Sequence, residues 1–250
     1  MTRFILIVAS LFIASCASQL PQTPPTGMGA EVAAPQFKAG NSWRYSVADG
    51  FTKIPRGTVE YRVSAVAADA VTVAVSTGDM QESTELYTAD GNWLRRPATN
   101  MQVFNYSPAY RAFDFPLAAG KTWKSRAIAT DPADGRSFPV IIEGKVLGWE
   151  KIKVPAGEFD TLKVRRHVFV DYWLQGERGQ SVIRETDWYA PALNQVARRE
   201  TTSQYLRLAD LTRPYGFVRV DDDPSGDGDA LPRYEQDEWL VYELIGHTGK

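Results

Sequence analysis

The sequence predicts an all-β fold, an antiparallel barrel or sandwich with at most one or two short helices. Alternating apolar and polar residues, with β-branched residues on one face, recur from Phe37 onward. No segment keeps an apolar i, i+3, i+4, i+7 pattern over three helical turns, and only residues 107–120 leave room for one short helix. Two stretches that begin at Ala39 and Ala119, AGNSWRY and AGKTWKS, match closely enough to predict two duplicated β units.

The N-terminal residues form the three-part pattern of a secretory signal. One positive charge at Arg3 precedes the apolar run 4–13, and small residues follow up to Cys16. The run is too short for a membrane-spanning helix, which needs about 20 residues. Residues 13–16, Ile-Ala-Ser-Cys, closely resemble the lipobox of bacterial lipoproteins. The resemblance implies a signal peptide over residues 1–15, cleavage before Cys16, and acylation of its sulfur and new amino group.

Cys16 is the only cysteine, so the chain forms no intramolecular disulfide and no cysteine-based zinc cluster. Acyl chains such as palmitate contribute about 0.8 kcal/mol per buried CH₂, so several chains on one residue anchor a protein stably. Ala17 follows where an aspartate would favour retention in the inner membrane. We therefore expect a cell-envelope protein on the outer membrane, facing the periplasm. The alternative is an ordinary signal peptide followed by a buried free thiol.

Residues 16–36 read as the lipidated cysteine and a tether rich in proline and alanine. Their four prolines favour extended, polyproline-like backbone: Pro21, Pro24, Pro25 and Pro35. A proline-rich recognition motif is disfavoured because no PxxP flanked by arginine is present. The remaining residues, 37–250, are predicted to form a single β domain.

Two segments show the strand pattern most clearly. Residues 59–63 and 71–75 alternate around the break 67–70, which predicts a hairpin. Further on, one face of a longer strand carries Leu162, Val164, Val168, Val170 and Tyr172, with polar residues including His167 on the other face. Arg166 is the one charged residue that intrudes on the apolar face. Pro-Ala-Gly at 155–157 predicts a tight turn before this strand.

The two Gly-x-x-Trp stretches extend into longer similar units. After each, strands are followed by a tyrosine segment that ends in paired arginines, at Leu86–Pro97 and at Trp188–Glu200. These similarities predict pseudo-repeats over about 37–115 and 116–205 that close on each other and hide their sheet edges. The alternative is a chance recurrence of residues that favour strands.

Two segments also carry a family resemblance. VPAGEFDTLKVRR at Val154–Arg166 and DWYAPALNQVARRE at Asp187–Glu200 resemble recurrent segments of bacterial envelope proteins grouped as domain of unknown function 3108. The resemblance implies an all-β periplasmic domain with no established catalytic residues. The chain departs from that pattern over about 206–237, a predicted acidic loop insertion before a last strand at 238–247.

Charge and motifs exclude several functions. A net charge of −2 provides no field to attract nucleic acid. The chain has two histidines, His167 and His247, and no Gly-x-Ser-x-Gly nucleophile elbow. Too few histidines are present for a histidine-based metal centre, and no phosphate-binding loop or dinucleotide fingerprint occurs. We therefore predict no cofactor and no metal site.

The acidic run at 221–230 partly matches a calcium-binding loop. Asp223 and Asp227 fit ligand positions, but Tyr234 stands where a bidentate glutamate is needed, and Pro232 breaks the exiting helix. A solvated loop is the prediction, with weak calcium binding as the alternative.

A pair of carboxylates provides the alternative function. Glu185 and Asp187 lie two positions apart on a predicted strand, hence on one face, as in a carboxylate-dependent hydrolase. Arginines lie close by at 184 and 198–199, and 30 acidic residues make such pairs frequent by chance.

The leading prediction is a non-enzymatic, lipid-anchored envelope protein that binds an envelope partner or an apolar ligand, or scaffolds assembly. Its aromatic residues are candidates either for core packing or for a ligand-holding concavity: Trp43, Trp123, Trp173, Trp188, Tyr189 and Trp239. Buried carboxylates that converge in a cleft would favour the hydrolase. An apolar hollow would favour a protein that carries an apolar ligand, and a filled interior would favour a scaffold.

Overall fold

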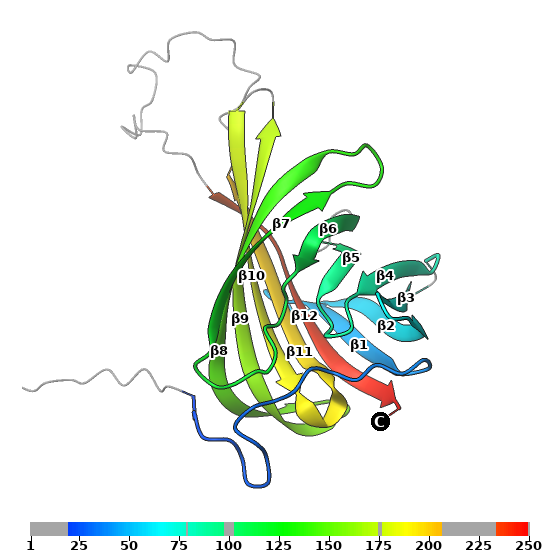
Figure 1. The fold of residues 1–250 in the computed structure, drawn as a ribbon, viewed down its shortest axis with the longest axis vertical. Coiled ribbons are helices and arrows are strands. Elements are labelled where there is room, and N and C mark those ends of the chain that lie inside the picture. Colours follow the sequence, from blue (N-terminus) through cyan, green and yellow to red (C-terminus); the bar gives the residue numbers. More distant parts are fainter. Residues whose placement is uncertain (1–19, 79, 98–102, 175–176, 207–233, 250) are drawn as a thin grey trace, which may run out of the picture.

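The computed structural model describes residues 20–78, 80–97, 103–174, 177–206 and 234–249. These residues form twelve antiparallel strands in one closed barrel, in which each strand pairs with its sequence neighbours and β12 returns to pair with β1 (Figure 1). The strands are β1 (Ser42–Asp49), β2 (Pro55–Val66), β3 (Val71–Thr77), β4 (Ser83–Tyr87), β5 (Trp93–Pro97), β6 (Val103–Tyr110), β7 (Thr122–Thr130), β8 (Ser137–Val154), β9 (Gly157–Leu174), β10 (Glu177–Ala190), β11 (Gln195–Leu206) and β12 (Tyr234–Thr248).

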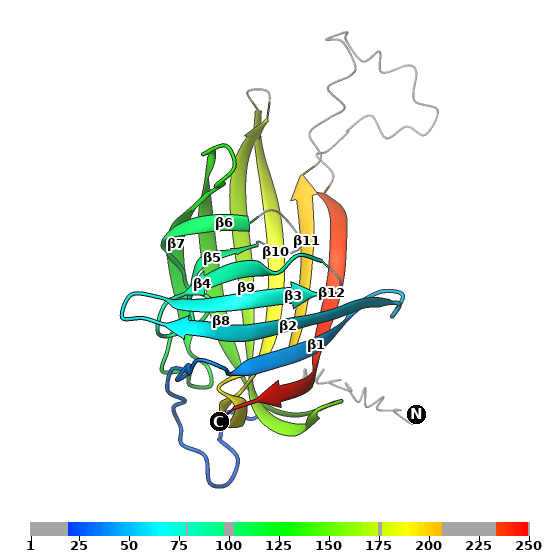
Figure 2. The ribbon, with the colours of Figure 1, turned by 90° about the vertical axis from the view of Figure 1, so that its right-hand side faces the viewer.

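The all-β prediction is confirmed, and of its two architectures the barrel is the one observed. Strands β1–β6 run across β8–β11, so the barrel is built from two crossed walls (Figure 2). The helical content of the described residues is one 3₁₀ turn, Pro191–Leu193, and residues 107–120 contain no helix. No helix among the described residues is long and apolar enough to cross a membrane.

The pairings follow the sequence pattern. The hairpin predicted around residues 67–70 joins β2 to β3, with Val63 opposite Val73. The turn at 155–157 joins β8 to β9, where Val154 pairs with Gly157. The last strand begins earlier than expected, at Tyr234, while the other residues of the predicted insertion, 207–233 with the acidic run, lie outside the described residues.

The two Gly-x-x-Trp stretches adopt the same turn. Gly40 and Gly120 have φ of 90° and 83°, in the left-handed region that favours glycine. The Gly40 N–H donates to the Val63 carbonyl at 2.8 Å, and the Gly120 N–H donates to the Val146 carbonyl at 2.9 Å. The turns lead into β1 and β7, which lie six strands apart in the barrel. The duplication of the two units stays a prediction.

Part of the predicted tether lies on the barrel wall. The Trp149 N–H donates to the Pro21 carbonyl at 2.8 Å, and Val32 forms a β-bridge with Leu117. We call the described segment, residues 20–36, the N-terminal strap. Whether it serves as a tether stays a prediction.

The barrel interior is mostly filled by apolar side chains. Valines, leucines and aromatic rings from all around the barrel form one contiguous core, because alternate residues of each strand point inward. The largest fully buried side chain among the described residues is nevertheless Arg166, on β9. A buried charge is costly unless it is paired, so the residues around Arg166 define the candidate site.

Candidate functional site

Charged side chains of both signs line the inside of the barrel. Within the described residues, three arginines and three carboxylates form ion pairs there: a linked set of Arg166, Arg199, Glu185 and Asp187, and a separate pair of Arg96 and Glu85. They come from β4, β5, β9, β10 and β11. The predicted carboxylate pair is therefore brought together and buried, but in contact with arginines.

Arg166 is completely buried and uses all three of its nitrogens. Its Nε donates to Glu185 Oε2 at 2.8 Å, and its Nη2 donates to Asp187 Oδ2 at 2.7 Å. Its Nη1 donates to the Ala112 carbonyl at 3.0 Å, and Tyr110 adds a hydroxyl donor to Glu185 Oε2 at 2.8 Å. These short, charge-assisted bonds satisfy the buried guanidinium.

Two arginines, Arg199 and Arg166, keep the Asp187 carboxylate ionised. Burial alone would raise the pKa of Asp187, but the positive charges of Arg199 and Arg166 outweigh it and hold that pKa well below its usual range. Burial also acts to lower the pKa of Arg166, and the charges of Glu185 and Asp187 reverse the effect. General acid–base catalysis requires a pKa near the operating pH. Asp187 is therefore a poor proton donor or acceptor at neutral pH.

Two hairpins, β4–β5 and β10–β11, carry the same arrangement of side chains. Each has an acidic residue, then a tyrosine two positions on, a short turn, and paired arginines of which the second contacts the acid. The matched residues are Glu85, Tyr87 and Arg96 in the first hairpin and Asp187, Tyr189 and Arg199 in the second. Both hairpins shift register just before the tyrosine. Each of the two arginine pairs found in the sequence thus places the guanidinium of its second arginine inside the barrel.

The two ion pairs differ in tightness. Arg199 holds Asp187 with two bonds, from Nε to Oδ1 at 2.6 Å and from Nη2 to Oδ2 at 3.0 Å. Arg96 reaches Glu85 with Nε–Oε2 at 3.5 Å and donates from Nη1 to the Tyr87 hydroxyl at 3.5 Å. Both of these distances are at the outer limit of hydrogen bonding. Arg96 is therefore loosely held, although its side chain is only 14% exposed.

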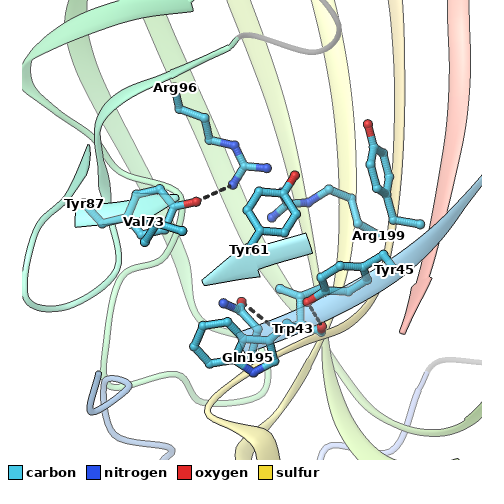
Figure 3. Close-up of a pocket in the computed structure, with 10 residues that line it drawn as sticks. Trp43, Tyr45, Tyr61, Val73, Tyr87, Arg96, Gln195 and Arg199 are labelled. Carbon is cyan, nitrogen blue, oxygen red and sulfur yellow. Dashed lines mark hydrogen bonds between the residues drawn. The ribbon is translucent and has the colours of Figure 1, made fainter. Parts of the chain in front are cut away.

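A cavity of about 40 Å³ lies between these hairpins and β1–β3. It is lined by Trp43, Tyr45, Tyr61, Val73, Tyr87, Arg96, Gln195, Val196, Arg199 and Tyr242. A second cavity of about 30 Å³ shares Tyr87, Arg96, Gln195 and Arg199 with the first. Since one water needs about 10–15 Å³ by this measure, the first cavity has room for about three. Figure 3 shows the guanidinium groups of Arg96 and Arg199 pointing toward one another.

The cavity is positively charged and walled by aromatic rings. No carboxylate is among the described residues that line the first cavity. Burial acts to lower the pKa of Arg96, but Glu85 and nearby tyrosines raise it well above its usual value, so the guanidinium stays charged. Its carbon lies 4.4 Å from the centre of the Trp93 ring and 5.6 Å from that of Tyr61, in cation–π contact.

Three of the candidate aromatic residues lie in the core. Trp43 and Trp123 are buried at the starts of β1 and β7, and Trp43 also lines the first cavity. The Trp123 Nε1–H donates to the Arg111 carbonyl at 3.2 Å. Tyr189 is buried and lines the second cavity, and its hydroxyl has no hydrogen-bond partner among the described residues.

Trp188 and Trp239 are not among the described residues that line these two cavities. Trp188 lies between two residues of β10 that point inward, so its own side chain points outward. Lys163 and Arg198 lie over its ring, and its Nε1–H donates to Glu150 Oε2 at 2.9 Å. Trp239 on β12 contacts Phe51 of the β1–β2 loop. Trp173 belongs to β9, but its side chain lies outside the described residues.

Sequence reasoning did not place Arg96 and Arg199 in a site. The repeated arginine pairs were the available signal, but a sequence pattern cannot tell which arginine of each pair points inward when a register shift precedes it. Arg166 also carried a signal, as the only charge on the apolar face of its strand.

Comparison with known proteins gives likeness of fold only. No protein-family model matches the chain, and no curated protein matches it in sequence. A proposed lipoprotein from Parabacteroides distasonis is 15% identical, with a TM-score of 0.49 over 88% of this chain and 100% of that chain. A proposed exported protein with a YmcC-like fold from Bacteroides fragilis is 12% identical, with a TM-score of 0.44 over 87% and 100%.

A third solved structure, the hypothetical lipoprotein YmcC from Escherichia coli, is 13% identical, with a TM-score of 0.41 over 68% of this chain and 86% of that chain. At these identities and TM-scores, the likenesses establish neither a family nor a function. The resemblance to domain of unknown function 3108 and the lipobox assignment stay predictions.

Proposed function

We propose that the chain is a lipid-anchored protein of the bacterial cell envelope that acts by binding and catalyses no reaction. The observation that carries the proposal is the state of the interior carboxylates. Glu185 and Asp187 converge as a hydrolase would require, but Arg166 forms an ion pair with each of them and Arg199 forms another with Asp187. The geometry therefore favours binding over acid–base chemistry.

The lipobox residues and the N-terminal strap support the envelope anchor. Cys16 precedes Pro21 by five residues, and Pro21 is hydrogen-bonded to β8. Five extended residues span at most roughly 18 Å, so an acylated Cys16 would hold the barrel close to the membrane surface. Ala17 after the cysteine favours the outer membrane, with the barrel in the periplasm.

The size of the interior space bears on what is bound. A cavity of about 40 Å³ has no room for an acyl chain unless its walls move. This favours binding of an envelope partner, or of a small group at the cavity, over storage of a large apolar ligand.

Two experiments test the proposal. Cys16→Ala should move the protein from the membrane fraction to the soluble fraction, whereas continued membrane association would contradict the anchor. Crosslinking in cells, followed by native purification with lipid extraction and mass spectrometry, should recover a reproducible partner or ligand. Recovery of neither would contradict the binding role. Turnover of an envelope glycan that Glu185→Gln abolishes without unfolding the barrel would instead establish the alternative hydrolase.

A further inference from the structure

We propose that the first cavity is a binding site for an oxyanion, a carboxylate or phosphate group, held between the guanidinium groups of Arg96 and Arg199. This inference rests on the proposed binding function and adds the chemical class of the bound group. Guanidinium groups match carboxylate and phosphate geometry because their N–H groups form parallel, charge-assisted bonds.

The charge of the cavity is the first support. Two guanidinium groups line it, and the carboxylates that balance them are not among its described lining residues. Arg199 uses its Nε and Nη2 for Asp187, and Nη1 is not part of that pair. A group in the cavity therefore lies beside two guanidinium groups and beside no carboxylate of the described lining residues.

The loose pairing of Arg96 is the second support. Charge-assisted bonds to a carboxylate are normally about 2.7–2.9 Å long, whereas the contacts of Arg96 to Glu85 and to the Tyr87 hydroxyl are 3.5 Å. A buried guanidinium with such long contacts gains more from a new anionic partner than Arg166, whose three nitrogens already bond at 2.7–3.0 Å.

The neutral polar groups around the cavity are the third support. Gln195 Oε1 accepts from the Val196 N–H at 2.9 Å, so the amide NH₂ of Gln195 is the part of the side chain that can donate to a ligand. Tyr61 and Tyr242 also line the cavity, and each has a hydroxyl group that can donate a hydrogen bond. Space for about three waters suits the oxygens of one carboxylate or phosphate group.

Titration of the non-acylated Cys16→Ala protein with inorganic phosphate tests the site. Calorimetry is done at constant ionic strength, with chloride as the balancing anion, because screening alone would otherwise change the signal. We expect saturable binding at one site per chain, with affinity at least tenfold lower in Arg96→Met. Arg62→Met, which removes an exposed β2 arginine that pairs with Glu82 on the surface, should leave the affinity unchanged.

Gln195→Leu provides a second variant that keeps every interior charge, and we expect it also to weaken phosphate binding while circular dichroism shows a folded barrel. No saturable binding of inorganic phosphate, or of either probe in the two further titrations below, by the folded wild-type barrel would overturn the inference. Equal affinity in wild type, Arg96→Met and Gln195→Leu would also overturn it, since phosphate would then be bound at the surface.

Two further titrations identify the source of the group. Dihexanoyl phosphatidic acid represents a lipid headgroup, and hexanoate represents a simple carboxylate. Tighter binding of the lipid than of inorganic phosphate, lost in Arg96→Met, supports the site and assigns it to an anionic lipid headgroup. Failure of all three probes, together with a reproducible crosslinked partner, would sink this inference and leave the proposed function standing.

Discussion

Hairpins β4–β5 and β10–β11 share an acid, a tyrosine, a register shift and an inward arginine, yet their ion pairs differ. In β10–β11 the acid is clamped by two arginines at 2.6–3.0 Å, whereas in β4–β5 the single contact of the arginine with its acid is 3.5 Å long. The difference comes from the neighbouring strands. β9 brings Arg166 against the second hairpin, while β3 brings Val73 and other valines against the first. The same pattern can therefore build a rigid core in one half of a barrel and leave a guanidinium available in the other.

Of the changes that test this comparison, removal of Arg166 should have the largest effect on the free energy of unfolding. Arg166→Met leaves Glu185 and Asp187 buried without their shared partner, and loss of one member of a buried ion pair costs about 3–5 kcal/mol in free energy of unfolding. Urea denaturation measures the loss. Arg165→Met, at an exposed position on the same strand, is the control and should change stability by about 0.5 kcal/mol or less. A similar small change for Arg166→Met would contradict a structural role for the cluster.

Removal of either of the two matched tryptophans, Trp43 and Trp123, should cause the next largest loss in free energy of unfolding. Both rings are buried, so Trp43→Ala and Trp123→Ala should each cost about 3 kcal/mol or more in free energy of unfolding. Trp123 should be the more costly, because its ring lies directly against Gly144, where an added Cβ would fall 2.1 Å from the ring, whereas Trp43 already faces a cavity. Thermal and urea unfolding measure both. Little destabilisation by Trp43→Ala, with loss of phosphate binding, would make that ring a ligand contact instead.

Acid should weaken the β10–β11 hairpin. The folded-state pKa of Asp187 is lowered, so its contribution is complete above the unfolded pKa of about 4 and disappears as the pH falls toward the folded value. A shift of this kind is worth about 2–3 kcal/mol. Urea unfolding measured from pH 7 to pH 3 should show the first part of this loss, about 1 kcal/mol, in the wild-type protein and a smaller loss in Asp187→Asn. The exposed control Asp69→Asn should retain the wild-type slope, and an unchanged slope in Asp187→Asn would refute the assignment.

Removal of Arg96 should have the smallest effect on stability. Its contacts are long, so Arg96→Met should lower the free energy of unfolding by about 1–2 kcal/mol, the range of one hydrogen bond to a charged group. Urea denaturation of Arg96→Met and Arg166→Met under the same conditions measures the difference between their losses in free energy of unfolding. Equal losses would mean that Arg96 is held as tightly as Arg166, and the contrast between the hairpins would fail.

Much of the fold could be predicted from the sequence because strands alternate with period two. The hairpin around residues 67–70, the inward face of β9 and the glycine turns before Trp43 and Trp123 are all local patterns. The closure of the barrel by β12 against β1 is a contact between the two ends of the chain, and alternation within a strand does not specify it.

The candidate site was harder to predict because it depends on contacts between distant strands. The paired carboxylates at 185 and 187 were identified, but their ion pairs with Arg166 could not be, because it lies about twenty positions earlier in sequence, opposite Glu185 in the β9–β10 pair. The meeting of Arg96 and Arg199 in one cavity required two hairpins, six strands apart, to face each other across the barrel.

Arg96 and Arg199 line the first cavity, whereas Arg166 is fully paired. This contrast is tested most directly by the structure of crystals grown with selenate, whose selenium gives an anomalous signal. The account predicts an anomalous peak in the first cavity, within hydrogen-bond distance of the guanidinium groups of both Arg96 and Arg199, and none beside Arg166. An empty cavity, with selenate only on the outer surface, would contradict it.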